Sequence, residues 1–71
     1  MIRKNVDSSN IKSVGYDPIL KILEIEFDGS GIYQYLNVPE DIYIDLMNAS
    51  SHGTYLNEFI KNKYLYREVS L

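Results

Sequence analysis

The chain has 71 residues, a hydrophobic fraction of 45%, a charged fraction of 24%, a formal net charge of −3 and no cysteine. This length fits one domain with one core, and the composition is that of a globular protein rather than a disordered segment. The absence of cysteine excludes disulfides, thiolate metal sites and thiol nucleophiles. The acidic net charge argues against a nonspecific nucleic-acid binder. Because a core this small is marginally stable and disulfides are excluded, we expect a homo-oligomer.

The sequence has no apolar run approaching the ~18–20 residues of a membrane span. Its basic N-terminal residues lead into no apolar segment typical of a signal peptide. We therefore expect a cytoplasmic protein with no membrane partner. Seven of the residues are tyrosines, against two phenylalanines and no tryptophan. Tyrosine suits surfaces that are partly buried and partly polar, as binding surfaces often are.

Strands are predicted in the first half of the chain. Residues 11–17 are a modest strand candidate, which Asp17-Pro18 ends. The clearest strand is Leu23–Phe27, in which apolar residues alternate with Glu24 and Glu26. This alternation predicts one face in the core and one face in solvent.

The segment Asp28-Gly29-Ser30-Gly31 predicts a hairpin turn, and Ile32–Val38 is the expected returning strand. A two-residue loop would place Tyr33 and Tyr35 on the solvent face of the sheet. A three-residue loop, Gly29–Gly31, would place both rings on the core face, with Gly31 in a left-handed conformation. We adopt the three-residue loop because it also leaves the polar Gln34 on the solvent face.

Helices are predicted in the second half. Pro39 suits the first position of a helix that ends around Asn48 to Gly53, and a second helix is expected over about Thr54–Lys63. The tail, Tyr64–Leu71, alternates in polarity and is a candidate edge strand. The sequence therefore predicts a single domain over residues 1–71 of the α+β class. We expect a three- to four-stranded antiparallel sheet followed by a two-helix hairpin packed on one face.

The residue types needed for catalysis do not combine into a site. His52 directly follows Ser51, and adjacent positions do not give the geometry of a base that activates a nucleophile. Glu24 and Glu26 are more simply a solvated sheet face than a metal site or an acid–base pair. The glycines at 29 and 31 do not open a helix, as a phosphate-binding loop does. We therefore expect no enzymatic activity, no metal and no cofactor.

Tyr33 and Tyr35 share a strand face, and two interpretations are open. The rings could form a platform on which nucleic-acid bases stack. Alternatively they fill the core beneath the helices, with their hydroxyls reaching its edge. The preferred hairpin register favours the core.

The segment from Ser51 to Lys63 is the second candidate site. Its proposed phosphate-binding residues are small polar groups, an amide and two lysines at about one-turn intervals: Ser51, Gly53, Asn57, Lys61 and Lys63. Tyr55 is a candidate stacking residue beside Tyr33 and Tyr35. Arg67, Arg3 and Lys4 are expected to add positive charge nearby. The alternative is that Ser51 and Gly53 cap the helix and the lysines face solvent.

A series of short motifs keeps a characteristic order over about residues 9–66. They are Ser9, Ile11, Val14-Gly15-Tyr16-Asp17, Leu23-Glu24-Ile25-Glu26-Phe27, Gly31, Tyr33-Gln34-Tyr35, Val38-Pro39, Tyr43, Leu46, Ala49-Ser50-Ser51-His52-Gly53, Tyr55, Asn57 and Ile60-Lys61. Their order resembles the KTSC domain, a family named for the C-terminus of some lysyl-tRNA synthetases that also occurs as small stand-alone proteins. The resemblance implies RNA binding through the synthetase association, and it implies no catalytic residue.

Three functions follow as expectations. The first is a non-enzymatic module that binds RNA or another phosphate-bearing nucleotide ligand. The second is a small oligomer that sequesters a free nucleotide or cyclic nucleotide signal, as some phage proteins do against host defence. The third is a protein-interaction module that uses an edge strand or the tyrosine-rich surface.

Overall fold

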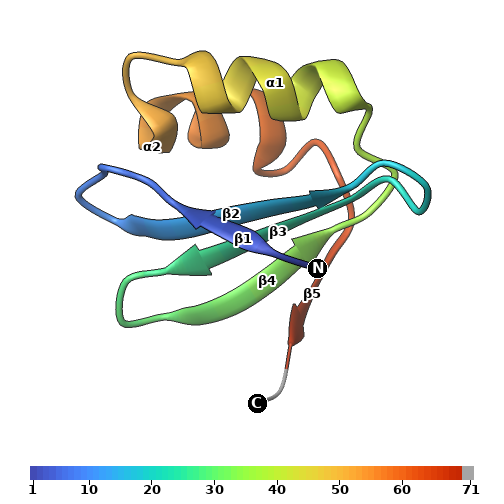
Figure 1. The fold of residues 1–71 in the computed structure, drawn as a ribbon, viewed down its shortest axis with the longest axis horizontal. Coiled ribbons are helices and arrows are strands. Elements are labelled where there is room, and N and C mark those ends of the chain that lie inside the picture. Colours follow the sequence, from blue (N-terminus) through green and yellow to red (C-terminus); the bar gives the residue numbers. More distant parts are fainter. Residues whose placement is uncertain (70–71) are drawn as a thin grey trace.

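The structure is a computed structural model that describes residues 1–69. One antiparallel sheet lies beneath a layer of helices (Figure 1). The strands, whose order in the sheet follows the chain, are β1 (Arg3–Asn5), β2 (Ile11–Asp17), β3 (Ile22–Phe27), β4 (Gly31–Tyr35) and β5 (Tyr66–Val69). The helices are α1 (Glu40–Asn48) and α2 (His52–Tyr55), and α2 continues directly into a π-helical turn, η1 (Leu56–Ile60). The α+β class is confirmed.

The predicted count of three to four strands is wrong, because the sheet has five. The tail does form an edge strand, β5, within the expected segment, while its last two residues, 70 and 71, lie outside the described residues. The strand that the sequence did not predict is β1, with the sequence Arg-Lys-Asn. These three residues show no apolar alternation, and they become a strand only by pairing with β2, where Lys4 lies opposite Val14. Propensity is a weak guide for so short an edge strand.

A β-bulge corrects the simple alternation of β2. The predicted bounds are confirmed, but the pairing with β3 shifts between Ile11 and Ser13. Strict alternation would place Ile11 and Val14 on opposite faces. Because the bulge at Lys12 adds one residue to this strand, both Ile11 and Val14 point into the core, where they are 1% and 0% exposed.

The β3–β4 hairpin places its tyrosines as predicted but uses a different loop. Phe27 pairs with Gly31, so the three loop residues are 28–30 rather than the predicted 29–31. Gly31 does have the expected positive φ, 93°. Tyr33 lies opposite Ile25, on the helix-covered face. The strand ends at Tyr35 instead of Val38, and the next two residues lead to a left-handed turn with φ of 57° at position 37.

Both helices begin or end at residues other than those predicted. Pro39 occupies the cap position, and α1 begins one residue later. The second helical segment begins at His52 and ends at Ile60, rather than running over Thr54–Lys63. It ends early because the backbone of Lys61 is extended, with φ of −62° and ψ of 132°. The N–H of Lys61 donates to the Leu56 carbonyl at 2.8 Å and closes the last, π-helical turn.

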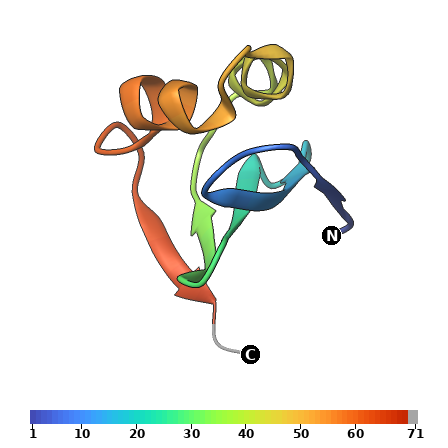
Figure 2. The same ribbon diagram turned by 90° about the vertical axis from the view of Figure 1, so that its left-hand side faces the viewer.

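The core lies between the helices and the upper part of the sheet. Its buried side chains come from β2, β3, β4, α1 and η1 and the segment that enters α1: Ile11, Val14, Leu23, Ile25, Tyr35, Val38, Leu46, Leu56 and Ile60. Figure 2 shows that the sheet is strongly twisted, with β2 close beneath the helices while β4 and β5 run away from them. Because the helices cannot follow this twist, part of the inner face of β4 and β5 stays uncovered.

A candidate ligand-binding groove

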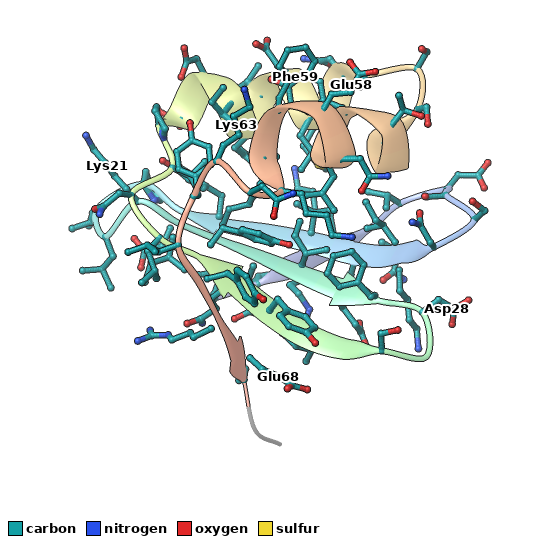
Figure 3. All side chains as sticks on the ribbon, turned by 180° about the vertical axis from the view of Figure 1, so that it is seen from behind. Lys21, Asp28, Glu58, Phe59, Lys63 and Glu68 are labelled. Atoms are coloured by element: carbon teal, nitrogen blue, oxygen red, sulfur yellow. The ribbon has the colours of Figure 1, made fainter. Side chains whose placement is uncertain are left out.

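The uncovered part of the inner sheet face forms a pocket of about 370 Å³, named here the aromatic pocket. It is bounded by β3, β4, β5 and the end of η1. Its lining residues are Asn10, Phe27, Asp28, Ser30, Tyr33, Tyr35, Asn57, Lys61, Asn62 and Tyr66. In Figure 3 aromatic side chains gather on this side of the sheet, with Asp28 at the hairpin tip. The pocket thus combines an aromatic floor with a polar rim.

Four rings, each in contact with at least one other, make up the floor. The centroids of Phe27 and Tyr33 are 5.6 Å apart in an edge-to-face arrangement. Tyr66 lies 5.8 Å from Tyr33 and 5.8 Å from Tyr35. Tyr35 is 3% exposed and Tyr66 is 61% exposed, so the cluster extends from the core to solvent. Burial, and then the neighbouring rings of Tyr66 and Tyr33, raise the pKa of Tyr35, which keeps its phenol neutral.

The rim carries one positive charge. Among the described residues, Lys61 is the one basic residue that lines the aromatic pocket, and Asn57 lies one helical turn before it. Asn62 follows with a positive φ of 66°, which turns the chain away from the helix. Asp28 stands on the rim as a negative charge. The rim can therefore hold one anionic group beside Lys61, together with amide hydrogen bonds.

A second pocket, of about 420 Å³, adjoins the first and is named here the polar pocket. It lies between the loop that precedes β2 and the start of α2. Its lining residues are Asp7, Ser8, Ser9, Asn10, Ser50, Ser51, His52, Gly53, Thr54 and Asn57. Asn10 and Asn57 line both pockets, so the two adjoin at these side chains and are together named here the groove.

Several of the polar lining residues already have local partners, among them Ser8, whose hydroxyl donates to the Asn10 side-chain oxygen at 3.2 Å. The Ser51 hydroxyl accepts a hydrogen bond from the Thr54 N–H at 3.3 Å and lies 3.0 Å from the Thr54 hydroxyl, which is an N-cap arrangement. His52 Nδ1 lies 2.8 Å from the Leu46 carbonyl oxygen at the end of α1. Ser51 and His52 therefore stabilise the turn between the helices, which is the capping role that the sequence left open for Ser51.

Gly53 allows a close approach between the start of α2 and the loop before β2. A Cβ atom at this position would lie 2.7 Å from the Asn10 side-chain oxygen, closer than real Cβ contacts. Because the obstructed atom ends a flexible, exposed side chain, Gly53→Ala is expected to move Asn10 while changing the unfolding free energy by less than about 1 kcal/mol. Displacement of the Asn10 side-chain amide resonances in an NMR spectrum would verify this. Unchanged resonances would contradict it.

The structure brings together six of the eight sequence-predicted site residues. Tyr33, Tyr35, Asn57 and Lys61 line the aromatic pocket, and Ser51 and Gly53 join Asn57 in the polar pocket. Tyr55 and Lys63 line neither. Tyr55 packs on Phe59 with the ring centroids 4.7 Å apart, and burial and the charges of Asp45 and Asp41 raise its pKa. Lys63 lies after the helices beside Tyr64 (Figure 3).

The expected cluster of basic residues around this site is wrong. Arg3 and Arg67 belong to the two opposite edge strands of the sheet. Both side chains lie on the outer face of the sheet, opposite the helices. There Arg3 binds Glu24, and Arg67 Nε donates to the Gln34 side-chain oxygen at 2.9 Å. Both side chains therefore lie away from the pockets, and Arg3 is paired with a carboxylate there.

The prediction that Glu24 lies on a solvated face of the sheet is wrong. Glu24 is only 7% exposed and accepts hydrogen bonds from Arg3 and from Gln34, the latter at 2.8 Å. Burial alone would raise the pKa of Glu24. The hydrogen bonds from Gln34 and Arg3 and the Arg3 charge outweigh burial and lower it. Gly15 makes room for this pair, because a Cβ there would lie 3.0 Å from the Arg3 side chain.

Among the groove residues that the sequence does not predict as site residues are Asn10, Phe27 and Tyr66. Phe27 was assigned to the core, and Tyr66 to an edge strand of unknown partner. Both were in predicted strands, and placing them beside Tyr33 required the strand order. Asn10 carried a weaker signal, since it ends a run of polar residues, 7–10, directly before a strand. Such a run is usually only a turn.

Across residues 1–69, no group of three or more histidine, aspartate and glutamate side chains is arranged to hold a metal ion. Neither helical segment in that range has the length and apolar character needed to cross a bilayer.

Comparison with known proteins relates the chain to one domain family. A family model described as the KTSC domain matches residues 7–64. A lysine–tRNA ligase of Nostoc is 39% identical over 64 residues, which cover 90% of this chain but 11% of the ligase. An uncharacterised protein of Stutzerimonas stutzeri is 38% identical over 90% of both chains. The crystal structure of a KTSC domain protein from Yersinia pestis is 45% identical, with a TM-score of 0.96 and 97% of each chain covered.

Proposed function

The chain belongs to the KTSC domain family, and from that premise we propose that it is a non-enzymatic module that binds RNA or another phosphate-bearing nucleotide ligand. The observation that carries the proposal is the aromatic pocket, in which four clustered rings adjoin the ammonium group of Lys61. The module would act in the cytoplasm. A region similar to this chain makes up 11% of the lysine–tRNA ligase of Nostoc, an enzyme whose name includes an RNA substrate, and this association favours RNA.

In this proposal the aromatic floor of the pocket binds a base, and its polar rim binds the phosphate and the edges of the base. A nucleobase stacks on aromatic side chains with a free energy of about 1–3 kcal/mol per base. Tyr66 offers the most exposed ring of the floor, and its contacts with Tyr33 and Tyr35 hold it in place. Amide groups of Asn10, Asn57 and Asn62 are available for the base edges, and Lys61 for one phosphate.

The number of charges limits the kind of nucleic-acid binding. Lys61 faces one Asp28 carboxylate across the same pocket, and the chain has a net charge of −3. Such a site engages one or two nucleotide units of a single strand and does not follow a long phosphate backbone. For one phosphate contact, the slope of log affinity against log salt is expected to be about −0.7.

Two lysines two residues apart provide a matched test. Lys61→Gln should weaken binding of a fluorescein-labelled, randomised ten-nucleotide RNA about fivefold, because it removes the rim charge. Lys63→Gln, outside the groove, should leave the affinity unchanged. Tyr66→Ala should weaken binding about tenfold through loss of stacking. Fluorescence polarisation at two salt concentrations would measure all three. Equal effects of the two lysine substitutions would show that the groove is not the binding site.

Two further measurements distinguish RNA from a free nucleotide as the ligand and determine the oligomeric state. The aromatic pocket is built within one chain, so RNA binding does not require the homo-oligomer that the small core predicts. Light scattering measures the oligomeric state. Native mass spectrometry of protein purified from cells would detect a retained mononucleotide, which would favour sequestration of a free nucleotide over RNA.

A further inference from the structure

The groove continues beyond the aromatic pocket, and the chemistry of its lining changes along its length. The aromatic pocket ends at Asn10 and Asn57, which also line the polar pocket. A strand whose base lies on the rings, with its phosphate beside Lys61, therefore reaches the polar pocket with the sugar or nucleotide next to it. This step rests on the proposed function, and it asks which part of the ligand the polar pocket recognises.

The lining of the polar pocket opposes a phosphate. Its polar side chains are hydroxyls, amides and an imidazole, and Asp7 is its one charged group among the described residues. A phosphate there would meet a carboxylate and no lysine or arginine. A sugar hydroxyl would meet a carboxylate acceptor at Asp7 and a hydroxyl at Ser9. The Asn10 side-chain oxygen already accepts from the Ser8 hydroxyl at 3.2 Å, so Asn10 offers the N–H groups of its amide as donors. The polar pocket is therefore suited to a neutral group that carries hydroxyls.

We propose that the polar pocket recognises ribose 2′-hydroxyls, so that the groove selects a ribonucleotide strand over the corresponding deoxyribonucleotide strand. The 2′-hydroxyl donates and accepts hydrogen bonds, and it is the group by which a protein distinguishes RNA from DNA. Asp7 is the acceptor for that hydroxyl. Asn10 lies at the junction of the two pockets, where Gly53 lets its side chain approach the start of α2.

The test compares two randomised ten-nucleotide strands that differ only in the 2′-hydroxyl, one of RNA and one of uracil-containing DNA. Wild-type protein should bind the RNA about tenfold more tightly, the effect of one to two hydrogen bonds. Equal affinity for both strands would overturn the selectivity and leave the proposed function intact. Binding of neither strand would overturn both.

Substitutions of two acidic residues distinguish recognition of the hydroxyl from simple charge repulsion. Asp7→Ala should reduce the RNA preference to about twofold, while the affinity for DNA stays the same or rises. Asp28→Ala, which changes the aromatic pocket alone, should raise the affinity for both strands equally and keep the preference. Gly53→Ala, which displaces Asn10, should also reduce the preference. An equal rise for both strands in Asp7→Ala would show that Asp7 acts only through its charge, and would overturn the assignment.

Discussion

Leu46→Ala is expected to lower the unfolding free energy by about 3 kcal/mol, the largest effect of any substitution considered for this protein. Leu46 is 0% exposed, and within α1 it is the one buried side chain. A domain of this length has a total stability of about 4–11 kcal/mol, so the loss is a large fraction of it. Urea unfolding followed by circular dichroism would measure the change.

Ile44 provides the control, because it lies two residues away on the same helix and is 48% exposed. Ile44→Ala should change the unfolding free energy by less than about 0.5 kcal/mol. The two substitutions remove aliphatic side chains of similar size, so a difference between them reports burial rather than helix propensity. Similar losses in both variants would mean that α1 packs on the sheet through another face.

Arg3→Met is expected to lower the unfolding free energy at neutral pH by about 2 kcal/mol. The substitution keeps the aliphatic stem but leaves the Glu24 carboxylate, 7% exposed, with Gln34 as its remaining hydrogen-bond partner among the described residues. Lys4→Met is the matched control, since Lys4 is the next residue of β1 and is exposed. It should change stability by less than about 0.5 kcal/mol.

The pH dependence gives this prediction a second readout. In the wild type the pKa of Glu24 is lowered from its ordinary value of 4.5, so the folded state favours the ionised carboxyl. Its stabilising contribution is present above pH 4.5 and is lost as the pH falls through the lower folded pKa. Without Arg3, the hydrogen bond and the charge that Arg3 supplies no longer oppose burial, so this stabilising contribution is smaller above pH 4.5.

The difference between wild type and Arg3→Met should therefore be largest at pH 7 and should decrease as the pH falls below 4.5, so that it is smaller at pH 3. Urea titrations of both proteins at the two pH values would measure it. A difference that does not change with pH would show that Arg3 stabilises the sheet by packing and not through Glu24.

Local pattern was enough to predict most of the regular elements. The alternation in Leu23–Phe27 and the turn residues after it gave both central strands and the face of Tyr33. Pro39 and the polar residues near Ser51 marked the two helices. These features depend on neighbours a few residues apart, so the chain itself carries the information. The order of the motifs also indicated the family, which the comparisons confirm.

The elements that the sequence did not predict depend on distant partners. β1 has no pattern of its own and is held by pairing with β2 and by the bond from Arg3 to Glu24, 21 residues away. The bulge at Lys12 is likewise visible only in the pairing. The prediction that Glu24 faces solvent is wrong for the same reason. No residue near Glu24 in the sequence indicates that Arg3 covers its carboxylate.

The same distinction between local pattern and distant contacts applies to the residues of the groove. The sequence by itself determined the α+β class, the faces of the strands, the family and the residue types available for a ligand, because these follow from local periodicity and order. Only the tertiary structure decided that Tyr66 and Phe27 join Tyr33, that Asn10 meets Gly53, and that Tyr55 and Lys63 stay outside. The twist of the sheet beneath a short helical layer sets these positions, and twist and long-range pairing leave no signal in neighbouring residues.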